Sequence, residues 1–309
     1  MADVERKSRR RKTRRLEAAL MLLYAWVAQA LPMAWRAKMG RAVGRISARL
    51  AGGRRRIARE NVESALGLDS EAAERVALES FAHFGRVFTE CLSLPRYGTE
   101  SASARFETEG WEHLRDAHAL GRGVIVFSAH FGNWELVALQ QALAGIPMDF
   151  IARPLDNPWV EKAFFRWRGT TGNRVLGKHG SLRKAVKSLR EGRALAILID
   201  QNVRSPPRLF FDFFGMPASV TPTLATLALR LDVPVVPVSS YPRDDGGYLI
   251  RYGPRLMPPE GLSDEETVVA MTGAATREVE AWIRERPDLW LWFHNRWKTK
   301  PRRHDVVHA

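Results

Sequence analysis

The chain has 309 residues, of which 45% are hydrophobic and 27% charged, enough to bury the core of one large or two small globular domains. Its formal net charge of +14 predicts an anionic partner, for which nucleic acid, anionic lipid head groups and acidic proteins are candidates. The single cysteine, Cys91, excludes an internal disulfide framework and a cysteine-based zinc cluster, is compatible with a reducing compartment, and lies in an apolar run that predicts a core position.

The amino terminus joins a basic segment to an apolar one. Residues 6–15, RKSRRRKTRR, carry eight lysines and arginines and precede the stretch 18–35, in which Gln29 is the only strongly polar residue. Three membrane or export interpretations fit: a secretory signal cleaved after AQA (28–30), a transmembrane helix, and an interfacial or re-entrant membrane anchor. An ordinary buried helix is the plainer alternative. A span would need about 20 apolar residues, and Pro32 falls near the end of this stretch.

The charges on both sides of the apolar stretch favour the anchor. Between Arg36 and Arg59 nine more lysines and arginines occur, and no acidic residue follows until Glu60. Because basic segments resist translocation, both flanks should stay on the cytoplasmic side, with their charges on anionic head groups. A basic nucleic-acid-binding protein is the alternative from another class, but the chain contains no recognised nucleic-acid-binding motif, and the apolar stretch does not suit that function.

The patterning divides the chain into two parts. We expect residues 1–60 to form a basic arm and membrane-associating helices, and residues 61–309 to form an α/β domain. Helical periodicity extends over residues 36–95, with Ser70 as a plausible N-cap before EAAE.

From residue 120 onward, short β-rich runs alternate with helical segments. Strands are expected at 123–129, 148–154, 194–200, 233–242 and 248–253, and helices at 133–145, 158–172, 181–192, 221–232 and 264–286. This alternation predicts an α/β fold with a mostly parallel central sheet flanked by helices on both faces, and with a helical N-terminal part packed against it.

A strand-to-helix corner, SAHFGNWE (128–135), carries the clearest candidate for chemistry. His130 follows an apolar strand and Glu135 lies in the first turn of the next helix, near the sheet edge where ligands bind in open α/β folds. Glu135 could orient the imidazole of His130 as a general base that deprotonates a hydroxyl or an amine. Asn133 as a helix cap, with Glu135 near the positive end of the helix dipole, would explain the same residues without catalysis.

Other chemistries fit this sequence less well. The spacing of His130 and Glu135 lacks the i, i+4 histidine pair of a zincin helix and has no third ligand nearby, so no metal site is expected. The chain contains no G-x-S-x-G nucleophile elbow. The segment GNRVLGKH (172–179) resembles a P-loop, but His179 replaces the Ser or Thr and the preceding strand is missing.

SAHFGNWE resembles the H-x4-[DE] motif of the bacterial late lipid A acyltransferases, the lauroyl and myristoyl transferase family within the glycerolipid acyltransferase superfamily. The resemblance continues in family order over most of the chain, through RRRIARENV, ARPLDNPWVEKAFFRWRGTTG, LAILIDQN, FFDFFGMPASVTPTLATLALR and LWLWFHNRWK. It implies a glycerolipid acyltransferase-like fold for residues 61–309 and direct acyl transfer without an acyl-enzyme.

The resemblance also assigns roles to residues. His130 would be the general base and Glu135 would orient it and stabilise the imidazolium, while Arg153 would contact an acceptor phosphate or the developing oxyanion. The remaining candidates for substrate binding are Asn133, Asn157, Arg168, Asp200 and Gln201.

The implied reaction moves a fatty acyl group to a hydroxyl of a glycolipid, most readily a lipid A precursor. Acyl carrier protein or coenzyme A would supply the acyl thioester as co-substrate, without a further cofactor or metal. The expected partners are acyl carrier protein, membrane lipids and the glycolipid, not nucleic acid, at the cytoplasmic face of the bacterial inner membrane. Phosphatidylinositol mannosides, aminolipids or lysophospholipids are alternative acceptors, and an inactive membrane scaffold of the same fold is a further alternative.

Two aromatic segments keep two interpretations each. The phenylalanines of LFFDFFGMPAS (209–219) suit either contact with lipid, as an acyl-chain pocket or an exposed lipid-facing lip, or plain core. The tryptophans of LWLWFHNRWK (289–298) suit core packing or interfacial anchoring, and neither segment suggests catalysis.

Overall fold

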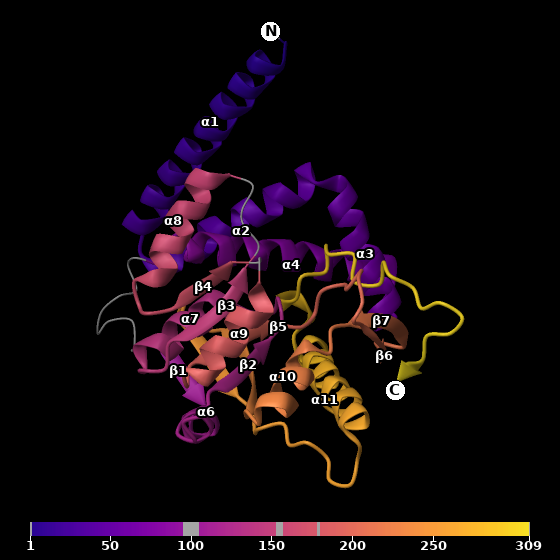
Figure 1. Ribbon diagram of the computed structural model, residues 1–309. Helices are drawn as coiled ribbons and strands as arrows, with labels where there is room; N and C mark the ends of the chain where they lie inside the picture. Colours follow the sequence, from indigo (N-terminus) through magenta and orange to yellow (C-terminus); the bar gives the residue numbers. More distant parts are fainter. Residues whose placement is uncertain (1, 95–104, 153–156, 178–179, 309) are drawn as a thin grey trace.

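The computed structural model describes residues 2–94, 105–152, 157–177 and 180–308. Its N-terminal third is helical (Figure 1), with α1 (Ala2–Ala30), α2 (Met33–Leu50), α3 (Gly52–Leu66) and α4 (Ser70–Cys91). Helix α1 ends two residues before Pro32. Proline has no N–H to donate to the preceding turn, and its ring disfavours a helical conformation of the residue before it. Helix α3 continues across residue 60, where the expected N-terminal part ends.

Helices α2 and α4 cross with their backbones almost touching. A Cβ atom on Gly44 would lie 2.0 Å from the Phe81 carbonyl oxygen, and one on Gly85 would lie 2.2 Å from the Gly40 oxygen. Only glycine permits this approach, which fixes α2 against α4 by backbone contact. Asp69 caps α4 by accepting a hydrogen bond from Ala72 N, so the expectation that Ser70 is the N-cap is wrong by one residue.

The central sheet of the described chain has seven strands in the order β1-β9-β8-β2-β5-β3-β4. The bounds are β1 (Phe106–Glu109), β2 (Val124–Ser128), β3 (Met148–Ala152), β4 (Arg174–Gly177), β5 (Ala194–Leu198), β8 (Val235–Pro242) and β9 (Tyr248–Tyr252). The five strands from β8 to β4 are mutually parallel. Strand β9 runs antiparallel to β8, and β1 pairs in parallel with β9. The prediction of a mostly parallel sheet is confirmed.

Helices cover both faces of this sheet, as the alternating pattern predicts. They are α6 (Trp111–His118), α7 (Trp134–Leu143), α8 (Pro158–Gly169), α9 (Ser181–Arg190), α10 (Thr223–Leu231) and α11 (Asp264–Glu285). In β2, Val124 and Val126 pack in one core with α6 and α7, and Ile125 and Phe127 pack in the other with α9, α10 and α11. A strand buried on both faces reads as a continuous apolar run, which is how VIVFS appears in the sequence.

A small second sheet lies beside α11. It has the order β10-β6-β7, with β6 (Leu209–Phe213) and β7 (Met216–Val220) forming a hairpin and β10 (Val307–His308) pairing with β6. The hairpin was not expected from the sequence. Its phenylalanines are buried, which favours core packing over an exposed lip; they are Phe210, Phe211, Phe213 and Phe214.

Candidate active site

The register of β2 and β5 brings His130 and Asp200 together. Ser128 pairs with Leu198 at the last position of the two parallel strands, so the residues two positions further on leave the sheet at the same edge. His130 Nδ1 lies 2.9 Å from Asp200 Oδ1, and the backbone N–H of His130 donates to Asp200 Oδ2 at 3.0 Å. The carboxyl ends of parallel strands are where open α/β sheets bind ligands.

The Asp200 carboxylate determines the tautomer of His130. Burial alone would raise the pKa of Asp200, but its electrostatic interaction with His130 and hydrogen bonds from His130 and Trp290 hold this pKa at about 2. An ionised carboxylate only accepts hydrogen bonds, so Nδ1 of His130 carries the proton and Nε2 keeps its lone pair. This is the form of histidine that can take a proton from a hydroxyl.

The lone pair of His130 Nε2 faces the partly exposed side of the site. The side chain of His130 is 20% exposed, and the Gln201 side-chain amide donates to Nε2 at 3.2 Å. The ring of Trp134 stands edge-on to the imidazole, with centroids 5.0 Å apart. A substrate hydroxyl that replaced the exposed amide of Gln201 would meet the basic nitrogen directly.

The corner after His130 is held by one strand, β8, and one helix, α4. Gly132 has φ +57°, and a Cβ atom there would lie 2.0 Å from the Ser240 carbonyl oxygen, so the corner requires glycine. The Ser240 hydroxyl accepts from Asn133 N at 2.8 Å. Nε2 of buried His83 on α4 donates to the Gly132 oxygen at 2.9 Å, and burial lowers the pKa of His83 to about 4.

Asn133 is buried inside this corner. Its Oδ1 accepts from Leu136 N at 3.2 Å, which caps α7. Its Nδ2 donates to Glu90 Oε2 at 2.8 Å, and Tyr248 donates to the same oxygen at 2.6 Å. Asn133 therefore shapes the turn, as the helix-cap alternative holds, and a role in substrate binding stays a prediction.

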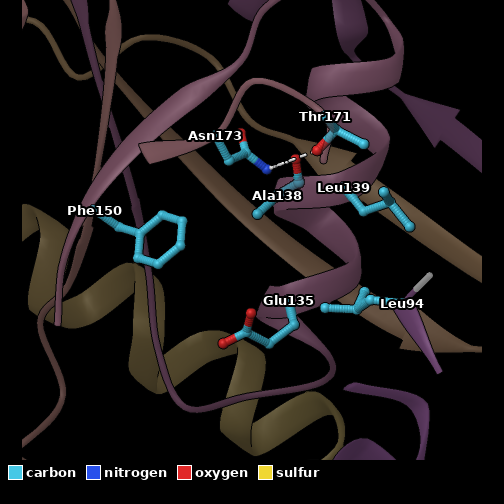
Figure 2. A pocket seen from close by; sticks show the side chains of 7 residues that line it. All are labelled: Leu94, Glu135, Ala138, Leu139, Phe150, Thr171 and Asn173. Atoms are coloured by element: carbon cyan, nitrogen blue, oxygen red, sulfur yellow. Dashed lines mark hydrogen bonds between the residues drawn. The ribbon is translucent and has the colours of Figure 1, made fainter. Parts of the chain in front are cut away.

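Glu135 does not orient His130 in this structure. Both ring nitrogens of His130 have partners among the described residues, and these are Asp200 and Gln201. Glu135 is buried, and its carboxylate projects into a small pocket lined by Leu94, Ala138, Leu139, Phe150, Thr171 and Asn173 (Figure 2). Asp200, expected to bind substrate, takes the orienting position instead because it follows the neighbouring strand.

Of the remaining predicted binding residues, only Asn157 has a described side chain, and its partners lie on α1 and α8. Asn157 precedes α8, where its Oδ1 accepts from Trp159 N and its Nδ2 donates to the Arg14 carbonyl oxygen of α1 at 2.7 Å. Arg153 lies outside the described residues, and of Arg168 only its place on α8 is described. Their roles stay predictions.

The segment after η2 (Pro287–Leu289) encloses the site, a role that its tryptophans did not predict. Leu291 N donates to the His130 oxygen at 3.2 Å, and the indole of Trp290 donates to Asp200 Oδ2 at 2.8 Å. Nε2 of His294 accepts from Asn202 N at 3.2 Å, and burial lowers the pKa of His294. The tryptophans at 290, 292 and 297 are buried, which favours core packing over interfacial anchoring.

Two features of the described residues bear on cofactors and membranes. No group of three or more His, Cys, Asp or Glu side chains there is arranged to hold a metal ion. None of the described helices combines the length and the apolar character that crossing a membrane requires.

Comparison with known proteins places this geometry in a family. The model of the bacterial lipid A biosynthesis acyltransferases matches residues 4–299. The chain is 27% identical over 285 residues to the lipid A biosynthesis lauroyltransferase of Escherichia coli K12, covering 89% of each chain. It is also 27% identical to the lipid A biosynthesis palmitoleoyltransferase of that organism, over 91% of this chain and 90% of the relative.

Two further matches are more distant. A phosphatidylinositol mannoside acyltransferase of Mycolicibacterium smegmatis is 25% identical over 223 residues, 71% of each chain. Among solved structures, a 1-acyl-sn-glycerophosphate acyltransferase of Thermotoga maritima matches with a TM-score of 0.37 and 17% identity, over 86% of this chain and 97% of that chain. With the family model matching almost from end to end, this chain belongs to the bacterial lipid A biosynthesis acyltransferase family.

Proposed function

We propose that this protein transfers a fatty acyl group from a thioester donor to a hydroxyl of a lipid A precursor. The observation that carries the proposal is the state of His130, which has its Nδ1–H on Asp200 and an Nε2 lone pair at the exposed edge of the sheet. The names of the relatives support the lipid class of the acceptor.

The reaction is a direct transfer. His130 Nε2 takes the proton from the acceptor hydroxyl while its oxygen attacks the thioester carbonyl carbon. The C–S bond of the tetrahedral intermediate then breaks, and the leaving thiolate takes the proton back from the imidazolium. Asp200 stabilises that imidazolium through Nδ1, and no serine or cysteine nucleophile is required.

Glu135 remains part of the proposed mechanism as a second negative charge. It is buried at the first turn of α7, in surroundings where a charge acts over a longer distance than in water. We propose that its carboxylate stabilises the transient imidazolium of His130 that forms during the transfer. Arg153 and Arg168 are proposed to bind phosphates of the acceptor.

The donor is proposed to be an acyl carrier protein, with coenzyme A as the alternative thiol. The net charge of +14 suits an acidic carrier protein, since complementary charge speeds encounter. Both donors present the same thioester to His130, so the site chemistry does not depend on which one is used.

The protein is proposed to work on a lipid surface, at the cytoplasmic face of the inner membrane. Helix α1 buries a face that contains Ala18, Ala25 and Ala28. Its opposite stripe is apolar and exposed, with side chains each more than half exposed at Leu16, Leu20, Leu23 and Trp26. A helix whose large apolar side chains are exposed, while its alanines pack against the protein, is suited to contact lipid. Basic side chains flank this stripe in the sequence and suit anionic head groups.

A transfer assay tests the proposed function. Purified protein is incubated with acyl carrier protein thioester or acyl coenzyme A as donor. The acceptor, in separate arms, is a lipid A precursor, a phosphatidylinositol mannoside or a lysophospholipid, and the masses of the products are measured by mass spectrometry. We expect an added acyl group on the lipid A precursor with wild type and none with His130→Ala. Equal transfer by wild type and His130→Ala contradicts the mechanism, and transfer only to another lipid contradicts the acceptor.

A further inference from the structure

Trp290 is the third donor to the carboxylate that holds His130. Asp200 Oδ1 accepts from His130 Nδ1, while Oδ2 accepts from His130 N and from Trp290 Nε1 at 2.8 Å. The indole N–H is therefore a second donor to Oδ2, beside the backbone N–H of His130. Three donors around one buried carboxylate leave it no freedom to rotate.

The indole itself is rigidly placed. Trp290 is 1% exposed, and its ring packs edge-on against Trp292 at 4.6 Å and against Phe213 at 5.8 Å. Its carbonyl oxygen accepts from the buried Ser80 hydroxyl on α4 at 2.5 Å. Trp290 also forms a bridge to Phe131, next to His130 in the chain.

The same segment holds His130 by its backbone. Leu291 N donates to the His130 oxygen, and Gly132 N donates to the Leu289 oxygen at 3.0 Å. The residues on both sides of Trp290 therefore fix the main chain at the corner, while the Trp290 side chain fixes the carboxylate that faces the imidazole. The segment of residues 289–291 thus positions both His130 and the carboxylate of Asp200.

We propose that Trp290 is a positioning residue of the transfer reaction, which acts through Asp200 to keep the proton of His130 on Nδ1 and the lone pair on Nε2. The inference rests on the proposed function, in which that lone pair is the base. Without the indole N–H, Asp200 can turn away from Nδ1, and the imidazole is then free to take the other tautomer, whose Nε2 accepts no proton.

Trp292 provides a matched control. It is fully buried like Trp290, lies two residues away, and donates its one indole hydrogen bond to the Pro287 carbonyl oxygen at 2.7 Å. Trp290→Phe and Trp292→Phe thus remove equal ring area and one N–H donor each, but only the first N–H faces Asp200. If Trp290→Phe does not fold, replacing Trp290 by benzothienylalanine removes the N–H and keeps the shape of the ring.

The first measurement is a double-mutant cycle on kcat/KM for the folded protein. Because a hydrogen bond to a charged group is involved, we expect Trp290→Phe to lower kcat/KM about tenfold. Trp292→Phe, which keeps an aromatic ring beside Trp290, should lower it much less. In an Asp200→Asn background, Trp290→Phe should cause no further loss, since its target is gone. Equal losses in both backgrounds would mean that Trp290 acts only as packing, and the inference would be wrong.

The second measurement does not require activity. In protein with 15N-labelled histidine, the signals of His130 are assigned by their loss in His130→Gln, and its tautomer is read from the nitrogen shifts. We expect the Nδ1–H form in wild type and Trp292→Phe, and a shift toward the Nε2–H form when the Trp290 N–H is removed. An unchanged tautomer overturns the inference even if the wild-type enzyme transfers acyl chains, whereas a shifted tautomer in an inactive wild type refutes only the proposed function.

Discussion

Asp200 stands beside His130 because each lies two residues beyond a register pair, Ser128 and Leu198, on adjacent parallel strands. The pairing is thus a property of the sheet and not of the helix that carries Glu135. A carboxylate from the neighbouring strand reaches the imidazole at Nδ1, on the side opposite to Nε2.

Asp200→Asn should reduce transfer strongly while leaving the fold intact. The asparagine amide can donate to Nδ1, which would leave the proton on Nε2 and remove the base. We expect kcat/KM to fall about 100-fold or more, measured in the transfer assay beside thermal unfolding. Asp232→Asn is the control, because Asp232 is 82% exposed and far along the chain from the site; a similar loss there would contradict the assignment.

Gly132→Ala should destabilise the corner. The new methyl group would meet the Ser240 oxygen at 2.0 Å in a left-handed backbone, so we expect a loss of about 3 kcal/mol in the free energy of unfolding. Gly67→Ala, with φ +64° and open space around the new Cβ, should cost only about 1 kcal/mol. Denaturant unfolding of both variants measures the difference, and equal losses would show that the close approach to Ser240 is not a constraint.

His83 should make the protein less stable in mild acid. In the unfolded chain its pKa is about 6.5, whereas burial holds the folded value at about 4. Between these pH values the unfolded chain binds a proton that the folded chain excludes, so stability falls as pH falls from 6.5 to 4, by about 3 kcal/mol in total.

His83→Gln keeps a donor for the Gly132 oxygen but does not titrate. Its loss of stability between pH 7 and pH 4.5 should be smaller than that of wild type by about 2 kcal/mol, as measured by urea unfolding at the two pH values. His304→Gln, at a side chain that is 76% exposed, should behave as wild type. A wild-type pH response in His83→Gln would refute the buried neutral imidazole.

The exposed stripe of α1 should govern binding to anionic vesicles. Burying one leucine in lipid contributes about 1.5 kcal/mol, so Leu20→Gln and Leu23→Gln should each weaken partitioning about tenfold. Leu68→Gln, a half-buried leucine after α3, is the control. Vesicle co-sedimentation at two salt concentrations separates the electrostatic from the apolar contribution to binding, since salt should weaken only the contribution of the basic residues. Unchanged binding in both α1 variants would refute the stripe as the lipid contact.

The sequence predicted the sheet well where its signals are local. The strand at 123–129 is found as Val124–Ser128, and the helix expected at 264–286 is found as Asp264–Glu285 with a capping box at Ser263 and Glu266. Apolar runs and caps are short-range features, and they specify such elements directly. The hairpin of Leu209–Val220 was missed because its turn at Phe214 and Gly215 lacks the usual asparagine or aspartate signal.

Local sequence patterns identified His130 in the candidate site but not the residues that contact it. His130 could be identified because it ends a buried strand, and the H-x4-E spacing suggested Glu135 as its partner. Which carboxylate faces Nδ1 depends on the order of strands in the sheet, and nothing local in ILIDQN states that this strand neighbours VIVFSAH. The indole of Trp290, 160 residues after His130, has still less local signal, since a buried tryptophan in an aromatic run suggests only core.

Helix α4 has a consequence for how the molecule unfolds. Along one helix, Ser80 binds the Trp290 carbonyl oxygen, His83 binds the Gly132 oxygen, and Glu90 binds the amide of Asn133. If the N-terminal helices separated from the sheet, all of these buried polar groups would lose their hydrogen-bond partners together. A partly open state would carry this whole loss of free energy and should therefore not be populated. Helices and sheet should therefore melt in one cooperative transition, and hydrogen exchange at the His130 corner should report the global stability of the chain rather than local fraying.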